Sequence, residues 1–188
     1  MGRCYFSFAD QIKMNDPGYF PYTPPTQLLH GLRAALDLLF TEGLPNVFAR
    51  HKLLADGVRA GVSALGLSLC AVAPQWHSDT VSAIRVPAGV NGADVCKLAY
   101  ERYRTSFGSG LGQVAGKVFR IGHLGDLNEV SCLAALASAE MALADAGADV
   151  ALGAGVAAAQ ACYRRAAAAS TPGSEPDPRQ PSLAGGPR

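Results

Sequence analysis

Residues 108–125 read GSGLGQVAGKVFRIGHLG, and this stretch decides how the middle of the chain folds. Its central run KVFRI is rich in residues that favour strands, and glycines flank it on both sides. Successive side chains of a strand point to opposite faces, so Phe119 and Ile121 share one face while Val118 and Arg120 share the other. The stretch therefore predicts a strand that joins an apolar core through one face and presents an arginine on the other.

The glycines of this stretch do not match a phosphate-binding loop. The pattern GxxxxGK[ST] needs a glycine five places before its second glycine, but counting back from Gly116 reaches Leu111. Val118 also follows Lys117 at the place where that pattern needs a hydroxyl residue. The dinucleotide-binding pattern GxGxxG needs a strand before it and a helix after it, whereas these glycines precede a strand. Both loop types are excluded, and Arg120 remains the candidate functional group.

On either side of this stretch, the chain alternates between helix-like and strand-like periodicity. An apolar stripe at helical spacing runs through Leu28, Leu32 and Leu36, and Asn91 is a suitable N-cap for a later helix. Asp126 and Glu129 have the spacing of a capping box. We expect helices over 26–43, 45–66, 91–107, 126–147 and 155–169, and strands over 67–72, 80–87 and 117–121.

This order of elements predicts an α/β fold in which helices cover one side of a small sheet. The first residues are dense in proline and glycine, which disfavour helix, so we expect an extended segment over 1–26. Residues 27–169 are expected to form one compact domain. Residues 170–188 are rich in proline, glycine and serine and are expected to be a disordered tail.

The composition excludes several classes of function. The 188 residues carry 16 basic and 15 acidic side chains and no polybasic run, so no nucleic-acid partner is expected. No segment is apolar for long enough to span a bilayer, and we expect a cytoplasmic protein. The five cysteines are widely spaced, and neither CxxC nor HxxxH occurs, so we expect free thiols and no metal site.

The pattern alone leaves two roles open for Arg120. A planar guanidinium can hold a carboxylate through two hydrogen bonds, and Gly116, Gly122 and Gly125 leave room for a ligand beside it. The alternative is a surface ion pair with a nearby Asp or Glu. His123 follows the same strand, and it either lines a pocket or is a hydrogen-bonded structural histidine.

Two long motifs of the chain resemble a known family. Residues 115–129 (AGKVFRIGHLGDLNE) and 9–51 (ADQIKMNDPGYFPYTPPTQLLHGLRAALDLLFTEGLPNVFARH) are similar to the C-terminal part of serine-glyoxylate aminotransferases, relatives of alanine-glyoxylate aminotransferase among the class V pyridoxal-phosphate enzymes. The resemblance runs from Tyr5 to about Gln160 in one register. It implies the small C-terminal domain of a fold-type I enzyme that uses pyridoxal 5'-phosphate. It also implies a homodimer that transfers the amino group of serine or alanine to glyoxylate, with small amino and keto acids as ligands.

The resemblance implies roles for individual residues as well. By its position in the RIG motif, Arg120 binds the carboxylate of the amino or keto acid. Thr23 of the YTPP motif contacts the cofactor phosphate of the partner subunit, and an aromatic residue just before it shares that role. Tyr19, Phe20 and Tyr22 all lie close to this position, and Tyr22 is the preferred candidate.

The resemblance assigns no catalytic residue to this chain. In the family, the Schiff-base lysine and the carboxylate against the pyridine nitrogen belong to the large N-terminal domain. Lys13, Lys52, Lys97 and Lys117 stand in none of the family's Schiff-base contexts, so we expect a C-terminal fragment that is inactive alone. The alternatives are a non-catalytic α/β binding or dimerisation module and a small carboxylate-binding protein that uses Arg120.

Overall fold

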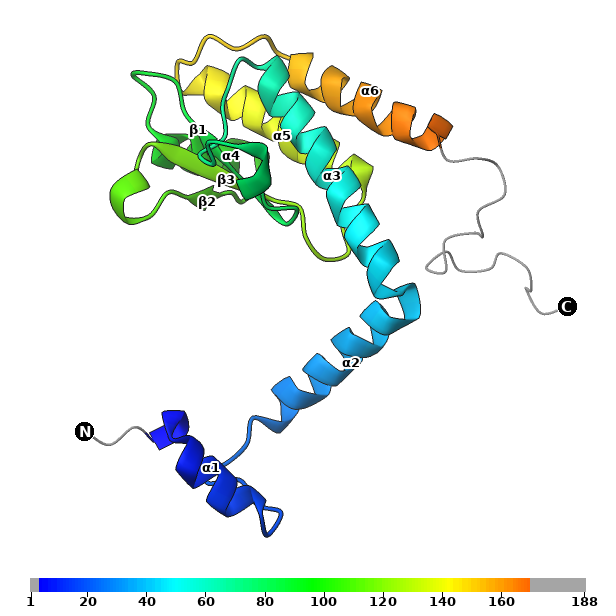
Figure 1. Cartoon of the computed structure of the whole chain (residues 1–188). Coiled ribbons are helices and arrows are strands. Elements are labelled where there is room, and N and C mark those ends of the chain that lie inside the picture. Colours follow the sequence, from blue (N-terminus) through cyan, green and yellow to red (C-terminus); the bar gives the residue numbers. More distant parts are fainter. Residues whose placement is uncertain (1–3, 170–188) are drawn as a thin grey trace, which may run out of the picture. The chain divides into compact units, whose positions relative to one another are not determined.

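The computed structural model describes residues 4–169, which form helices and one small sheet (Figure 1). Contacts within the chain divide it into two units, Met1–Leu44 and Pro45–Arg188. The domain boundary expected at residue 26 stays a prediction about the organisation of the protein. The tail expected over 170–188 lies outside the described residues.

The first unit begins with two short helical elements where the sequence predicts an extended segment. The 3-10 helix η1 (Cys4–Phe6) is followed by α1 (Phe8–Asn15). Ser7 caps α1, because its hydroxyl accepts a hydrogen bond from the Asp10 amide at 3.3 Å. The prediction was wrong for these residues because the residues that break helices are concentrated after the end of α1.

The helix α2 (Thr26–Glu42) confirms the helix expected from the apolar stripe. It ends before Gly43, whose φ of +84° lies in the region that favours glycine. No residue of α2 is buried, and Leu28, Leu32 and Leu36 are 73%, 56% and 38% exposed. The first unit therefore carries an apolar helix surface that is open to contact.

The second unit contains three antiparallel strands: β1 (Val81–Arg85), β2 (Gly108–Ser109) and β3 (Val118–Gly122). Their order in the sheet is β1-β3-β2, so β3 is the central strand. The strands expected over 80–87 and 117–121 are confirmed. The very short β2 was not predicted from the sequence, and the strand expected over 67–72 does not form.

The segment before β1 pairs with that strand at a single point. Leu69 makes an isolated bridge with Ile84, and the Cys70 amide donates a hydrogen bond to the Ala83 carbonyl at 2.8 Å. The chain then enters the 3-10 helix η2 (Pro74–Trp76), where proline has no amide to donate to a strand. The expected strand was therefore wrong because its pairing is confined to one bridge.

The remaining helices confirm those expected from the sequence: α3 (Leu44–Ala64), α4 (Gly92–Tyr103), α5 (Glu129–Asp145) and α6 (Ala154–Ala169). Asn91 caps α4 as predicted, since its side chain accepts from the Ala93 amide at 2.9 Å. The capping box expected from Asp126 was wrong. Asn128 caps α5 instead and accepts from the Ser131 amide at 2.9 Å, because it directly precedes the first helical residue.

The register of the sheet gathers its apolar side chains on one face. Ile84 lies opposite Phe119, and Ser82 lies opposite Ile121, and all four side chains are buried. Helical side chains complete this core, among them Leu54, Val58, Val95 and Leu136. The predicted α/β fold, with helices packed on one face of a small sheet, is confirmed.

The alanine-rich helix α6 packs through small residues. A Cβ added at Gly61 of α3 would lie 2.9 Å from the Gly155 carbonyl of α6, closer than a Cβ normally comes to a backbone atom, so this approach requires glycine. The buried carboxylate of Glu140 on α5 accepts hydrogen bonds from the amides of Gly153 and Val156, at 2.6 and 3.0 Å. Val156 lies in the first turn of α6 and Gly153 directly precedes the helix, where unpaired N–H groups favour a carboxylate. Helices α3 and α5 together hold the start of α6.

Three further observations apply to residues 4–169 only. None of the helices within residues 4–169 combines the length and apolar character that a membrane span requires. Four cysteines are free thiols, as expected from the sequence: Cys70, Cys96, Cys132 and Cys162. No group of three or more His, Cys, Asp or Glu side chains in this part of the chain could hold a metal ion.

His123 follows β3 and is completely buried. Its Nδ1 donates to the Asp79 carbonyl at 3.1 Å, and its Nε2 lies 3.0 Å from the Ser82 hydroxyl. Burial lowers the pKa of His123 below its ordinary value of about 6.5, and the charge of Arg59 acts in the same direction, against the hydrogen bond to Asp79. Of the two roles left open by the sequence, His123 has the structural one.

His123 should make the stability of the second unit depend on pH. A histidine whose pKa is lower in the folded than in the unfolded chain makes its full contribution to the free energy of unfolding above about pH 6.5. That contribution is lost as the pH falls toward the folded pKa. The free energy of unfolding, measured by urea titration from pH 8 to pH 5, should fall with pH in the wild type and fall less in His123→Gln. His30→Gln, on the exposed α2, is the control. Equal pH slopes for the wild type and His123→Gln would contradict this expectation.

Candidate functional site

Arg120 occupies the centre of β3 on the face of the sheet opposite the core. Its register partners are Ala83 on β1 and Gly108 on β2. The Arg120 side chain is half-buried, whereas Val118 on the same face is only 1% exposed. Gly92, at the start of α4, lies against the backbone of Val118 and helps to cover it. Arg120 is therefore the long side chain that β3 leaves partly accessible on this face.

The guanidinium of Arg120 packs beside Gly108. A Cβ added at Gly108 would lie 3.0 Å from Arg120 Nε and 3.1 Å from Nη2. The Nε atom is buried and has no hydrogen-bond partner among the described residues. Burial raises the pKa of the Cys96 thiol on α4, and the charge of Arg120 acts in the opposite direction.

The alternative role of Arg120, a surface ion pair with a nearby carboxylate, has no partner among the residues that the structure describes. The ion pairs within residues 4–169 join Lys52 and several arginines to carboxylates, such as Arg59 to Asp56 and Asp79, and none of them includes Arg120. A half-buried guanidinium without a carboxylate partner is a suitable binding group for a small anion.

Two side chains of α3 hold the loop that follows β3. Arg50 Nη1 donates to the Gly125 carbonyl at 2.6 Å, and the Gly125 amide donates to His51 Nε2 at 3.0 Å. His51 Nδ1 in turn donates to the Val47 carbonyl at 2.7 Å, which leaves Nε2 free to accept. Both backbone groups of Gly125 are thus fixed, at a φ of +87°. No local pattern points to these contacts, because the partners lie 74 and 75 residues apart.

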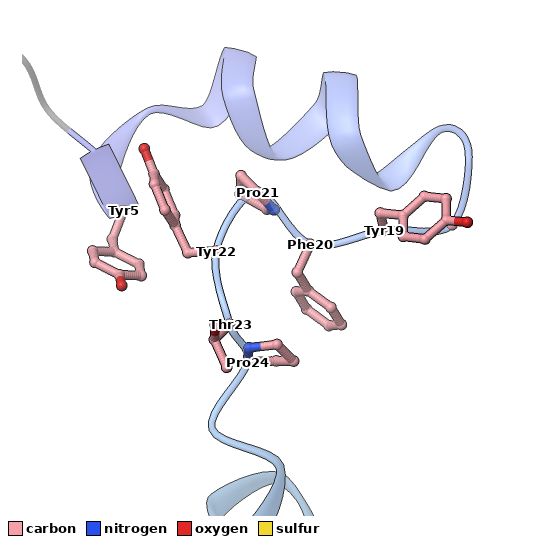
Figure 2. A pocket seen from close by; sticks show the side chains of 8 residues that line it. Tyr5, Tyr19, Phe20, Pro21, Tyr22, Thr23 and Pro24 are labelled. Carbon is pink, nitrogen blue, oxygen red and sulfur yellow. The ribbon is translucent and has the colours of Figure 1, made fainter.

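The residues expected near a cofactor phosphate lie in the first unit. Tyr5 and residues 18–24 line an open hollow of about 720 Å³ (Figure 2). The rings of Tyr5 and Tyr22 have their centroids 4.4 Å apart, and the Tyr22 hydroxyl points away from Thr23 (Figure 2). Thr23 is exposed, and its hydroxyl has no hydrogen-bond partner in the part of the chain that the structure describes.

This hollow offers hydroxyl groups and no positive charge. Its described lining includes the hydroxyls of Tyr5, Tyr19, Tyr22 and Thr23 but neither lysine nor arginine. Hydroxyls donate hydrogen bonds to phosphate, whereas the charge of a phosphate is best matched by cationic groups. Thr23 and Tyr22 therefore fit a supporting role in a phosphate site that other groups complete. They belong to the first unit, and Arg120 belongs to the second.

Comparison with proteins of known sequence identifies close relatives. The chain is 62% identical over 170 residues to a serine-glyoxylate aminotransferase of Hyphomicrobium methylovorum, a match that covers 90% of the chain and 42% of the relative. It is 52% identical over 168 residues to an L-aspartate-glyoxylate aminotransferase of Paracoccus denitrificans, covering 89% of the chain and 42% of that relative. The chain thus spans about two fifths of the length of the curated relatives it matches. No family model matches it.

The fold leads to the same group of proteins. The crystal structure of pyridoxamine-pyruvate aminotransferase from Mesorhizobium loti matches the chain with a TM-score of 0.75 and 40% sequence identity. The match covers 78% of this chain and 38% of that one. In sequence and in fold, the chain therefore corresponds to a segment of the serine-glyoxylate aminotransferases and their relatives.

Proposed function

We propose that this chain is part of a pyridoxal-phosphate-dependent aminotransferase that transfers the amino group of serine or alanine to glyoxylate, with Arg120 binding the substrate carboxylate. The observation that carries the proposal is the half-buried Arg120 guanidinium, which has no carboxylate partner among the described residues. The relatives support the acceptor, because the names of both curated relatives above include glyoxylate. Their names differ in the donor, serine or aspartate, whereas a carboxylate is common to all these substrates.

Arg120 would contribute binding and orientation. A guanidinium that holds a carboxylate through two parallel hydrogen bonds also fixes the direction of the substrate's Cα–H bond. Pyridoxal phosphate, when bound, stabilises the negative charge that develops at Cα as this proton leaves. The position of Arg120 in the central strand suits this task, since a strand paired on both sides holds its side chains in place better than a loop does.

Thr23 and Tyr22 are our proposed contacts to the cofactor phosphate of the partner subunit. The loop that carries them contains Pro21, Pro24 and Pro25, which restrict its backbone. A hydroxyl on a restricted loop loses little conformational entropy when it binds a ligand. The exposed Thr23 hydroxyl fits this role more directly than Tyr22, whose ring lies beside Tyr5.

The Schiff-base lysine of the proposed enzyme would lie outside this segment. A lysine that forms a Schiff base is typically shielded from water beside the cofactor. All four lysines of the chain are exposed instead: Lys13, Lys52, Lys97 and Lys117. Lys52 also forms an ion pair with Asp56 at 2.7 Å.

We also propose that the protein is a homodimer and that α2, with residues 20–25, contributes to the subunit interface. Leu28, Leu32 and Leu36 form one apolar face of α2 and are all exposed. Contiguous apolar surface of this kind marks an interaction site more often than a free surface. The same observation supports the dimerisation part of the alternative function, a non-catalytic module.

Substitution of Arg120 should weaken substrate binding while the fold is kept. In the complete enzyme, Arg120→Lys keeps the charge but loses the two parallel hydrogen bonds to the carboxylate, and Arg120→Ala loses both the charge and the hydrogen bonds. Removing one partner of a buried charged pair costs about 2 to 5 kcal/mol, so kcat/KM for serine and glyoxylate should fall at least about tenfold in Arg120→Ala. The absorbance of bound cofactor should stay the same in both variants.

The matched control is Arg85→Ala, which removes an exposed arginine from β1. Its kcat/KM should stay close to that of the wild type. Unchanged kcat/KM in Arg120→Ala, with an unchanged circular dichroism spectrum, would show that Arg120 does not bind substrate.

Polar substitutions on the apolar face of α2 should weaken self-association. The wild-type chain should elute from gel filtration as a dimer or larger species, and Leu28→Gln combined with Leu32→Gln should shift it toward the monomer. Leu38→Gln is the control, because Leu38 is as exposed as Leu28, at 73%, but lies off this face. A wild-type chain that stays monomeric at high concentration would rule out this interface.

A further inference from the structure

We propose that Gly108 is a positioning residue for Arg120. The absence of a side chain at this point of β2 lets the guanidinium pack beside the strand, and this contact sets where a bound carboxylate lies. The inference rests on the proposed role of Arg120 in carboxylate binding, and it concerns what holds the guanidinium in place.

The register of the sheet brings the two residues together. Gly108 is the partner of Arg120 across the antiparallel β2–β3 pair. A Cβ built at Gly108 would therefore lie on the same face as the Arg120 side chain, opposite the core. A Cβ at Gly108 would lie 3.0, 3.1 and 3.2 Å from Nε, Nη2 and Cζ of Arg120. These separations are shorter than ordinary contacts between heavy atoms, so the guanidinium would have to move by a few tenths of an ångström.

No hydrogen bond within the described chain resists such a movement. Arg120 Nε is buried without a partner, and the terminal nitrogens make no ion pair with residues 4–169. Packing against Gly108 therefore holds the guanidinium more than polar contacts do. Because Nε is covered, the two terminal nitrogens form the edge that remains for a carboxylate, and a displaced guanidinium would present that edge at the wrong place.

Backbone conformation does not explain the glycine at this position. Gly108 has no positive φ, so other residues could adopt its backbone angles. Gly122 gives a direct contrast: it lies two residues after Arg120 on the same face of β3, has no positive φ, and a Cβ there would meet no atom within 4 Å. A side chain at Gly108 meets Arg120, and a side chain at Gly122 meets open space.

The first test uses the Arg120 Nε–Hε signal in NMR spectra of the ¹⁵N-labelled chain. The signal is assigned by its loss in Arg120→Lys. In Gly108→Ala it should shift and its proton should exchange faster with water, because the guanidinium moves away from its covered position. In Gly122→Ala it should stay at the wild-type position. An identical signal in the wild type and Gly108→Ala would overturn the inference, and this test needs no ligand.

The second test is a titration with glyoxylate. The dissociation constant should rise at least about threefold in Gly108→Ala and stay unchanged in the control Arg85→Ala, which removes an exposed side chain from β1. In the Arg120→Lys background, Gly108→Ala should have no further effect, because lysine has no guanidinium to displace. Independent effects of the two substitutions would show that Gly108 acts on the fold in general, and would overturn the inference.

The two tests separate this inference from the proposed function. Equal glyoxylate affinities of the wild type and Arg120→Lys would count against the role of Arg120, whatever its signal does in Gly108→Ala. If the affinity depends on Arg120 but is unchanged in Gly108→Ala, the proposed role of Gly108 is wrong and that of Arg120 is kept. Thermal midpoints of both glycine variants are measured alongside. If Gly108→Ala is unfolded while Gly108→Ala with Arg120→Lys is folded, the clash with the guanidinium is demonstrated directly.

Discussion

The second unit depends on the pairing of β3 with a strand on each side. Because β3 is central, its register is fixed by both neighbours, and its side chains are divided between two faces. Phe119 and Ile121 enter the core that the helices cover, and the same register then places Arg120 on the opposite face. A shift of one residue would exchange the two sets of side chains. The hydrophobic core therefore also determines where the guanidinium lies.

Hydrogen bonds, rather than apolar contacts, hold the chain just beyond β3. His123 is bonded to Asp79 and Ser82, and Gly125 is bonded through both backbone groups to Arg50 and His51 of α3. These contacts tie the end of the strand to β1 and to the longest helix of the unit. If Arg120 binds substrate as proposed, it gains from this arrangement, since a rigid support loses little entropy when a ligand binds.

Three surfaces of the described chain need a complementary group that residues 4–169 do not supply. The Arg120 guanidinium lacks an anion, the hollow around Thr23 has hydroxyls without a cation, and α2 exposes an apolar face. The proposed function supplies a different partner for each: a substrate carboxylate, further phosphate-binding groups, and an apolar surface of a second subunit. This combination agrees with a segment that spans about two fifths of the aminotransferases to which it is related.

The sequence by itself determined the features that depend on neighbouring residues. The alternation in KVFRI, the helical stripes and the Asn91 cap all act within a few residues, and all appear in the structure. Local patterns were wrong at α1, at residues 67–72 and at Asp126, where a nearby cap or the absence of a pairing strand decided the outcome. Only the tertiary structure decided the burial of His123, the hold on Gly125 and the contact between Gly108 and Arg120. The first two join residues 41 to 75 positions apart, and the third depends on a strand of two residues whose register no local pattern specifies.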